Sequence, residues 1–301
     1  MLASALAGLV ACGSPEEPRS APDTCSTSRP LETGTSVRKI TAGGRTRSYV
    51  LHVPPRYDPT TRTPLVMLFH GLGGDPRSVV RTTGMAQAAD DENAILVAPL
   101  GRGKISHWDF RSPLTNPRSD LAFVRTLVKH VKREGCIDSS RTYAAGFSNG
   151  SALTLALACD GSTDFAAYAA VSGPYFTSEC TRAPAASILY FHGMRDSTVP
   201  YGGAQTVVGK LPPVNDTMSM WASHDACPSS GATTTASDDV QHWSWRSCRN
   251  RTSVDIYAIV DGVHGWPGGG PMSPGRTSRT KDSPIDATRV MWDFFGRHTS
   301  A

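Results

Sequence analysis

The strongest constraint on the fold is a series of short, fully apolar runs separated by segments with helical periodicity. Such runs occupy 65–69, 94–98 and 188–191. Each is short and lacks polar alternation, as in a strand that is covered on both faces. Between them, apolar residues recur at helical spacing over 121–131, and 151–159 is rich in Ala and Leu. This alternation predicts an α/β fold with a mostly parallel central sheet and helices on both faces.

The remaining segments give weaker signals. Further strands are expected at 47–53, 142–145 and 254–259. A last helix is expected to open at Pro284 and to bury Val290, Met291, Phe294 and Phe295. The stretch 201–252 is less regular, and we interpret it as a small surface excursion near the site. The Gly- and Pro-rich stretch 266–279 is expected to be a loop.

The N-terminus has features of an export signal. An apolar run from Leu2 to Ala11 precedes Cys12, which resembles a bacterial lipoprotein signal whose cysteine is lipidated. No Lys or Arg precedes the run, unlike a usual signal peptide, so a frayed apolar N-terminus is the alternative. The run is too short to span a bilayer as a helix. We expect a signal over 1–11, a flexible tether over 12–36 and a folded domain over 37–301.

The cysteines fit the same interpretation. With Cys12 set aside, six of the seven cysteines remain, and an even number in an exported chain indicates disulfides. The short spacings favour the pairs Cys159–Cys180 and Cys227–Cys248, which leaves Cys25–Cys136. Buried free thiols are the alternative.

Charge and motifs exclude several classes of function. The chain has 30 basic and 26 acidic residues and a net charge of +4. These charges form no block that would indicate binding to nucleic acid or to an anionic membrane. The sequence has no H-E-x-x-H, no paired C-x-x-C and no G-x-G-x-x-G motif. We therefore expect no metal, no cofactor, membrane contact only through a lipid anchor, and a monomer.

The segment 146–150 reads Gly-Phe-Ser-Asn-Gly and fits the pattern G-x-S-x-G. It lies between an expected strand and an expected helix, where a sharp turn would present the hydroxyl of Ser148 above the sheet. The backbone N–H of Asn149 would then point at a developing oxyanion from a helix N-terminus. Five residues alone arise often by chance, and a turn serine flanked by glycines is the alternative.

A second glycine-rich turn, Phe-His-Gly-Leu-Gly-Gly, follows the apolar run 65–69. Its glycines would let another backbone N–H, that of Leu72, reach the same oxyanion. A strand-to-helix turn without a ligand is the alternative.

Asp196 and His264 each lie in a loop that follows an expected strand. An aspartate in this place can accept the histidine N–H and fix its tautomer. The order Ser148, Asp196, His264 favours this interpretation over an exposed turn aspartate and a loop histidine bound to backbone. His70 and His192 are interpreted as turn-bracing or core residues. The other histidines considered lie in polar stretches, namely His224, His242 and His298.

Together these segments resemble the secreted esterase family that includes polyhydroxybutyrate depolymerases, feruloyl esterases and acetylxylan esterases, and its lipoprotein depolymerase branch above all. The segments that carry the resemblance are R-T-R-S-Y-V-L-H-V-P, F-H-G-L-G-G, S-D-L-A-F-V, G-F-S-N-G, F-H-G-M-R-D-S-T-V-P-Y and V-H-G-W-P-G-G-G. The resemblance implies an α/β-hydrolase fold with Ser148 as nucleophile, His264 as base and Asp196 as its acidic partner.

The resemblance also implies Leu72 and Asn149 as oxyanion donors and a substrate pocket lined by Trp108 and Trp266. For both tryptophans plain core packing is the alternative. The implied activity is hydrolysis of carboxylic esters: hydroxyalkanoate oligomers, feruloyl or acetyl polysaccharide esters, or short acyl esters. A serine peptidase and a catalytically silent, ligand-binding lipoprotein on the same fold remain alternatives.

Overall fold

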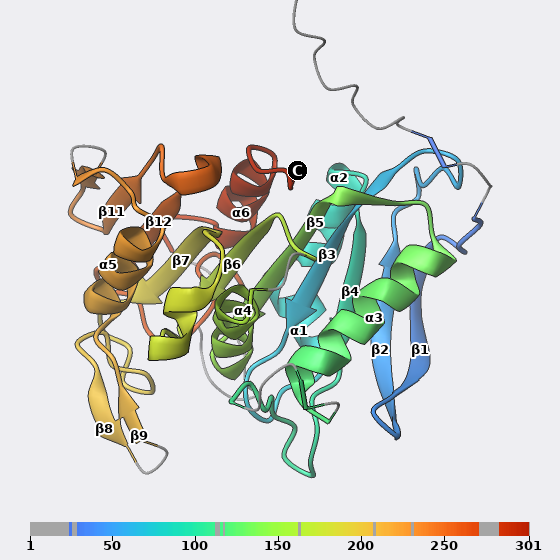
Figure 1. The fold of residues 1–301 in the computed structure, drawn as a ribbon, viewed down its shortest axis with the longest axis horizontal. Helices are drawn as coiled ribbons and strands as arrows, with labels where there is room; N and C mark the ends of the chain where they lie inside the picture. The colour runs from blue at the N-terminus through green and yellow to red at the C-terminus, as the bar shows by residue number, and fades with distance from the viewer. Residues whose placement is uncertain are drawn as a thin grey trace, which may run out of the picture.

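The computed structural model describes residues 24–25, 29–111, 115–116, 118–161, 164–206, 209–229, 232–270 and 283–300. Its centre is a ten-stranded sheet with the order β1-β2-β4-β3-β5-β6-β7-β12-β11-β10 (Figure 1). The strands from β4 to β12 in this order run parallel, and two antiparallel strands lie at each edge. The predicted α/β fold with a mostly parallel sheet is therefore confirmed.

The elements follow in regular alternation along the middle of the chain. The strands of the large sheet are β1 (Gly34–Ala42), β2 (Arg45–Val53), β3 (Thr63–Phe69), β4 (Ile95–Pro99), β5 (Ile137–Phe147), β6 (Ala167–Val171), β7 (Ser187–Gly193), β10 (Ala232–Ala236), β11 (Val240–Trp245) and β12 (Val254–Ile259). The helices are α1 (Pro76–Thr83), α2 (Met85–Asp91), α3 (Asp120–Glu134), α4 (Asn149–Cys159), α5 (Val214–His224) and α6 (Ala287–Phe295). A separate hairpin is formed by β8 (Ala204–Thr206) and β9 (Gly209–Leu211).

The sheet separates two apolar cores. Successive side chains of a strand point to opposite faces, so Met67 and Phe69 of β3 enter one core and Val66 and Leu68 enter the other. The first core also takes in the apolar sides of α3, α4 and α5, whereas α1, α2 and α6 cover the second. Helices on both faces explain why the central strands read as continuous apolar runs rather than as alternating ones.

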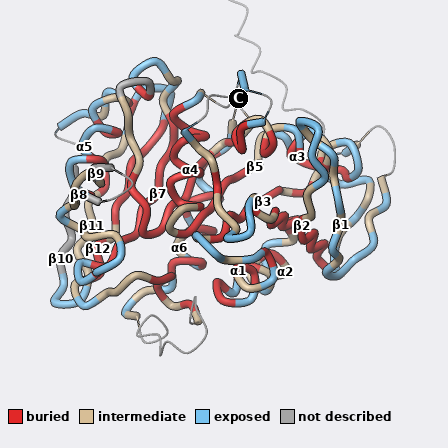
Figure 2. Tube along the Cα trace, turned by 90° about the horizontal axis from the view of Figure 1, so that it is seen from below, coloured by how far each residue is buried: buried red, intermediate tan, exposed pale blue. Residues whose placement is uncertain are grey.

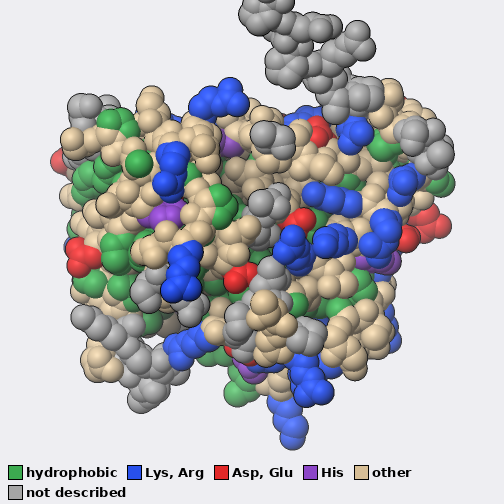
Figure 3. Space-filling view, in the orientation of Figure 1, with side chains coloured by type: hydrophobic (Ala, Val, Ile, Leu, Met, Phe, Trp, Pro, Cys, Tyr) green, Lys and Arg blue, Asp and Glu red, His purple; other side chains and the backbone are tan. Residues whose placement is uncertain are grey.

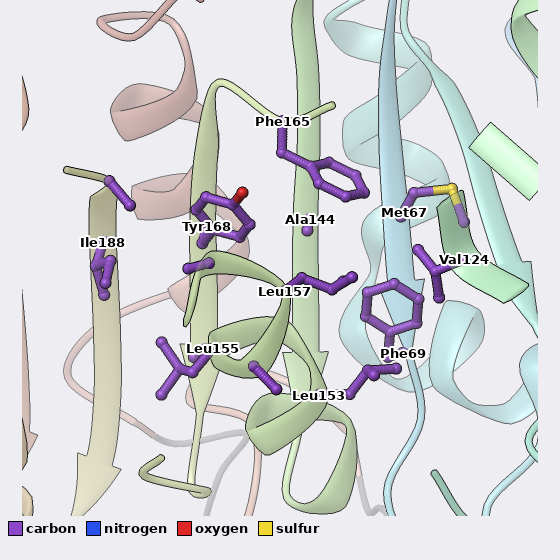
Figure 4. Close-up of a cluster of buried hydrophobic side chains, with 14 of the residues drawn as sticks. Met67, Phe69, Val124, Ala144, Leu153, Leu155, Leu157, Phe165, Tyr168 and Ile188 are labelled. Carbon is purple, nitrogen blue, oxygen red and sulfur yellow. The ribbon is translucent and has the colours of Figure 1, made fainter. Parts of the chain in front are cut away.

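Helix α4 lies at the centre of the first core. Its Leu153, Leu155 and Leu157 pack against strand residues such as Phe69 and against Tyr168 (Figure 4). Gly150 to Cys159 are all buried, as expected for a helix that is apolar on every side. Buried segments run through the middle of the molecule and exposed ones lie around it (Figure 2). The residue before this helix, Ser148, is thus carried by a helix that is buried along its length.

Most predicted elements occur in the structure with shifted ends. The predicted strand 254–259 coincides with β12, and 142–145 is the middle of the longer β5. Helix α3 begins at Asp120 because the Ser119 side chain caps it by accepting the Ala122 N–H at 3.1 Å. The final helix begins at Ala287 rather than at Pro284, since Asp286 provides its N-terminal cap.

The N-terminal boundary of the domain requires a correction. The tether was expected to extend to residue 36, but β1 already begins at Gly34 and Cys25 is bonded to Cys136. Leu31 also packs against the first core. Strand β1 lies at the edge of the sheet and alternates polar with apolar residues, so its apolar signal is weak. The predicted signal over 1–11 and Cys12 lie outside the described residues.

The interpretation of 201–252 as a surface excursion is also wrong in part. Strands β10 and β11 extend the large sheet beyond β12, and α5 packs Trp221 into the first core. Among the described residues of this stretch, β8 and β9 form a separate two-stranded sheet. An antiparallel edge is only partly covered, so its residues lack the continuous apolar run by which the central strands were recognised.

Three disulfides join the cysteines in the pairs that the spacings favoured. They are Cys25–Cys136, Cys159–Cys180 and Cys227–Cys248. The first closes a chain segment of 111 residues and fastens the N-terminal segment to the start of β5. Among the described residues, no helix is both long and apolar enough to cross a bilayer.

Candidate active site

Ser148 stands on a sharp turn between β5 and α4. Its backbone has φ 54° and ψ −117°, a region that residues other than glycine seldom adopt. The turn is held because the Ser148 N–H donates to the Val171 carbonyl at 2.7 Å and the Ser148 carbonyl accepts the Ala152 N–H at 3.1 Å. The strained residue therefore presents its side chain at the carboxyl ends of the parallel strands.

The glycines on either side of this turn are required by close backbone contacts. A Cβ on Gly146 would lie 2.2 Å from the Gly150 carbonyl oxygen, and a Cβ on Gly150 would lie 2.4 Å from the Phe69 carbonyl oxygen. Both contacts are far below van der Waals distance. The pattern G-x-S-x-G thus reflects how tightly β5, α4 and β3 approach one another here.

His264 connects the Ser148 hydroxyl with the carboxylate of Asp196. Its Nε2 lies 3.0 Å from Ser148 Oγ, and its Nδ1 lies 2.7 Å from Asp196 Oδ2. An ionised carboxylate accepts only, so Nδ1 carries the proton and Nε2 is free to accept the hydroxyl hydrogen. The His264 ring also packs against the Phe147 ring, with centroids 4.9 Å apart. The structure thus brings together three residues that are distant in sequence, in the geometry that removes a proton from a serine.

The Asp196 carboxylate is fully buried and well supplied with donors. Its Oδ1 accepts the backbone N–H groups of Thr198 and Val199, each at 2.8 Å. Burial alone raises the pKa of Asp196, but hydrogen bonds from His192, His264 and the Val199 N–H outweigh it. The resulting pKa lies well below the usual range of an aspartate. The group therefore stays ionised at any pH at which the fold is intact.

A second histidine stands behind this carboxylate. His192, fully buried, places Nε2 2.8 Å from the Val199 carbonyl oxygen and 3.3 Å from Asp196 Oδ2. Its Nδ1 is 2.8 Å from the Tyr190 hydroxyl. The Val199 carbonyl can only accept, so Nε2 carries the proton and points it toward the aspartate loop. The interpretation of His192 as a core residue is right, but its contact with Asp196 was not expected. The four-residue spacing in H-G-M-R-D was the available signal.

Two backbone N–H groups next to Ser148 are open to a ligand. Within the described part of the chain, neither the Leu72 nor the Asn149 N–H has an acceptor, whereas the Gly73 and Gly74 N–H groups donate to Ser106 and Gly71 carbonyls. A Cβ on the neighbouring Gly71 would lie 3.3 Å from Ser148 Cβ, so this turn passes directly beside the serine. The Leu72 side chain is 66% exposed.

The two tryptophans expected to line the pocket are buried, which agrees with the alternative of core packing. Trp266 is fully buried and donates through Nε1 to Thr288 Oγ1 at 2.9 Å. Trp108 donates through Nε1 to the His70 carbonyl at 2.8 Å, and its backbone N–H donates to Asn149 Oδ1 at 2.7 Å. Trp108 therefore braces the turn that carries Leu72.

The other histidines have structural partners. His70 is buried, accepts the Gly101 N–H at Nε2 and donates from Nδ1 to the Gly71 carbonyl. Burial lowers the pKa of His70, so this ring is neutral and fixed. His224, His242 and His298 lie beside Asp225, Asp255 and Ser253. In the described ranges no group of three or more His, Cys, Asp or Glu side chains is arranged to hold a metal ion.

Comparison with known proteins gives the family. Residues 40–263 match the family described as "Putative esterase". The chain is 30% identical to "Putative esterase NocK" of Nocardia uniformis over 285 residues, which cover 84% of this chain and 82% of that protein. It is 32% identical over 171 residues to "Probable feruloyl esterase C" of Aspergillus flavus, which cover 55% of this chain and 60% of the relative.

Solved structures give the same fold. An acetyl xylan esterase from Aspergillus awamori matches with a TM-score of 0.62 and 16% identity, over 87% of this chain and 99% of that one. At this identity the likeness shows the fold and not the substrate. The fold is thus that of the α/β-hydrolases, and with the family match over residues 40–263 the chain belongs to the esterase family.

Proposed function

We propose that the protein hydrolyses carboxylic esters through an acyl-enzyme on Ser148. The observation that carries this proposal is His264, whose two ring nitrogens lie 3.0 Å from Ser148 Oγ and 2.7 Å from Asp196 Oδ2. His264 takes the hydroxyl proton as Ser148 Oγ attacks the ester carbonyl. The imidazolium that forms is stabilised by the ionised Asp196 and then protonates the leaving alcohol.

The remaining steps use the same groups. The tetrahedral oxyanion accepts the Leu72 and Asn149 N–H groups, which have no other acceptor within the described residues. After the alcohol leaves, His264 takes a proton from water, and the hydroxide oxygen attacks the acyl carbon. The bond between that carbon and Ser148 Oγ breaks, a carboxylic acid is released, and Oγ regains a proton. No cofactor takes part in this sequence.

The nucleophile is tested by Ser148→Ala, with Ser78→Ala as a control at a half-buried serine of α1. We expect Ser148→Ala to lose hydrolysis of p-nitrophenyl acetate by at least about 10³-fold and Ser78→Ala to retain it. A fluorophosphonate probe should label the wild type and the control but not Ser148→Ala. Labelling of the unchanged protein distinguishes an esterase from a silent binding protein on the same fold. Turnover by Ser148→Ala at the wild-type rate would refute the assignment.

The proposed substrates are esters of plant-type polysaccharides or short acyl esters. Support comes from relatives whose names are feruloyl esterase and bifunctional acetylxylan esterase/xylanase. A panel of methyl ferulate, acetylated xylan, hydroxybutyrate oligomers and p-nitrophenyl esters would rank these classes. An amide analogue of the best substrate tests for peptidase activity, which we expect to be absent.

We further propose that the protein is exported and anchored by lipid at Cys12. Three disulfides support export, because such bonds persist in oxidising compartments. The cysteine that follows the apolar run 2–11 supports lipidation. Palmitate labelling of the wild type that is lost in Cys12→Ser, with cleavage of the signal blocked by globomycin, is the expected result. Unlabelled wild-type protein in the medium would contradict the anchor.

A further inference from the structure

A groove lined by basic residues lies at the end of the sheet that carries Ser148, outside the site described above. It is formed by the turn between β1 and β2, the segment that follows β4 and the first turn of α3. Its volume is about 550 Å³, within the range of sites for small molecules (roughly 300–1,000 Å³). Figure 3 shows Lys and Arg side chains along α3, of which only the first turn borders the groove.

The lining carries more positive than negative charge. Its cations are Lys39, Arg45, Arg47, Arg102 and Arg118. Two of them are neutralised, because Arg47 pairs with the buried Asp120 and Arg102 pairs with Asp109. The other three are exposed, and within the described residues they have no acidic partner. The groove therefore has an excess of three positive charges that protein carboxylates do not offset.

The charges of the neighbouring cations affect Arg47, the most buried cation of the groove. Burial lowers the pKa of Arg47, Asp120 raises it, and the charges of Arg102 and Arg45 lower it further. Arg47 nevertheless keeps its charge, since a guanidinium deprotonates only far above neutral pH. Repulsion between like charges at one place favours the binding of an anion there.

The wall of the groove is also the support of the active site. The Arg47 guanidinium lies 5.4 Å from the centre of the Trp108 ring, and the Trp108 N–H is bonded to Asn149 next to Ser148. Gly101, which lines the groove, donates its N–H to His70 at 2.9 Å. A ligand in the groove would thus lie one residue layer away from the turn beside the serine.

We propose that this groove binds a carboxylate of the substrate itself, so that the preferred substrate is the ester of an acidic oligosaccharide. The proposal rests on the ester hydrolysis proposed above and adds its substrate class. Arginine forks match carboxylates, and the hydroxyls of Thr46 and Ser48 in the lining suit sugar hydroxyls. The ester is held at Ser148 while an acidic sugar further along the chain is held by Arg45, Lys39 and Arg118.

The test compares two acetylated xylo-oligosaccharides of equal length, one neutral and one carrying a glucuronic acid branch. The variant is Lys39→Gln with Arg45→Gln. The matched control is Lys129→Gln with Arg289→Gln, two exposed cations of α3 and α6 that do not line the groove and whose loss changes net charge equally. Hydrolysis of p-nitrophenyl acetate by all three proteins checks that the catalytic residues are intact.

We expect the wild type to have a higher kcat/KM on the acidic substrate than on the neutral one. The difference should lie in KM and should become smaller when salt is added. The groove variant should lose about 2- to 30-fold on the acidic substrate and little on the neutral one, as expected for two exposed ion pairs. The control should behave as the wild type. Equal kcat/KM on both substrates in the wild type, or an equal loss in groove and control variants, would overturn the proposal. If the wild type did not hydrolyse p-nitrophenyl acetate at all, the esterase function itself would be refuted.

Discussion

Replacing Asp196 by asparagine should disable the enzyme by trapping His264 in the wrong tautomer. The Oδ1 atom of Asp196 accepts two backbone N–H groups, from Thr198 and Val199, at 2.8 Å each. An asparagine that keeps these bonds must place its oxygen at Oδ1 and its NH₂ group at Oδ2. That NH₂ donates to His264 Nδ1, so the ring proton moves to Nε2, which then faces Ser148 as a donor. In this tautomer His264 cannot accept the hydroxyl proton.

The size of the loss follows from two contributions. Turning the amide round to restore the right tautomer loses two hydrogen bonds, which costs about 2–3 kcal/mol. The variant also lacks the carboxylate charge that stabilises the imidazolium, worth at most about 3–4 kcal/mol at this separation with an effective dielectric constant near 20. Together they amount to about 5–7 kcal/mol, or roughly 10⁴- to 10⁵-fold in rate. Equivalent changes in serine proteases have a similar size.

The assay is kcat/KM for p-nitrophenyl acetate, compared between the wild type, Asp196→Asn and Asp261→Asn. Asp261 is an exposed aspartate of the His264 loop that pairs with Arg195 on the surface. We expect the loss to appear in kcat, with folding unchanged by circular dichroism, and Asp261→Asn to retain activity. An Asp196→Asn enzyme within tenfold of the wild type would refute the tautomer argument.

Three further outcomes are expected. Cys25→Ser with Cys136→Ser should lower the free energy of unfolding by about 5 kcal/mol, because it opens a segment of 111 residues, and a loss below 1 kcal/mol in denaturant titrations would contradict this. Gly150→Ala should reduce kcat at least tenfold because its Cβ would meet a β3 carbonyl oxygen at 2.4 Å, whereas Gly202→Ala, with nothing within 4 Å, should be neutral; equal kcat values would argue against a tight turn. The folded-state pKa of Asp196 is depressed, so its stabilisation is present above the unfolded pKa near 4 and is lost as the pH falls below that value. The wild type should therefore lose more unfolding free energy than Asp196→Asn between pH 5 and pH 3, and equal losses would contradict the depressed pKa.

The central part of the fold could be predicted because its residues carry a single signal. Strands such as β3 and β7 are covered by helices on both faces, so most of their positions are apolar, and this is visible in sequence. Strands β1 and β11, toward the two edges of the sheet, have one partly solvated side. Polar and apolar side chains alternate or mix along these strands. A tether or an irregular surface segment has a similar sequence pattern. The errors at both ends of the sheet have this common cause.

The site was predictable to the extent that motifs encode backbone geometry. A Cβ on Gly146 or Gly150 would lie 2.2 or 2.4 Å from a backbone oxygen, so these positions require glycine. The turn could therefore be inferred from the sequence without coordinates. The burial of Trp108 and Trp266 could not, because a tryptophan beside a motif is compatible with both a pocket wall and a core. The basic groove was also hidden, since Lys39, Arg45 and Arg118 come from two separate segments that meet only in the folded chain.

The bond between Cys25 and Cys136 has a consequence for how the molecule is oriented. Cys136 directly precedes β5 and Ser148 directly follows it. Because Ile137 pairs with Thr63 and Gly146 pairs with Phe69, β5 separates the two by about the length of β3, roughly 20–25 Å. The N-terminal segment is therefore fastened to the folded domain at the end of β5 that lies opposite Ser148. If the protein were held by its N-terminal segment, the Ser148 hydroxyl would therefore lie on the side that faces away from the support.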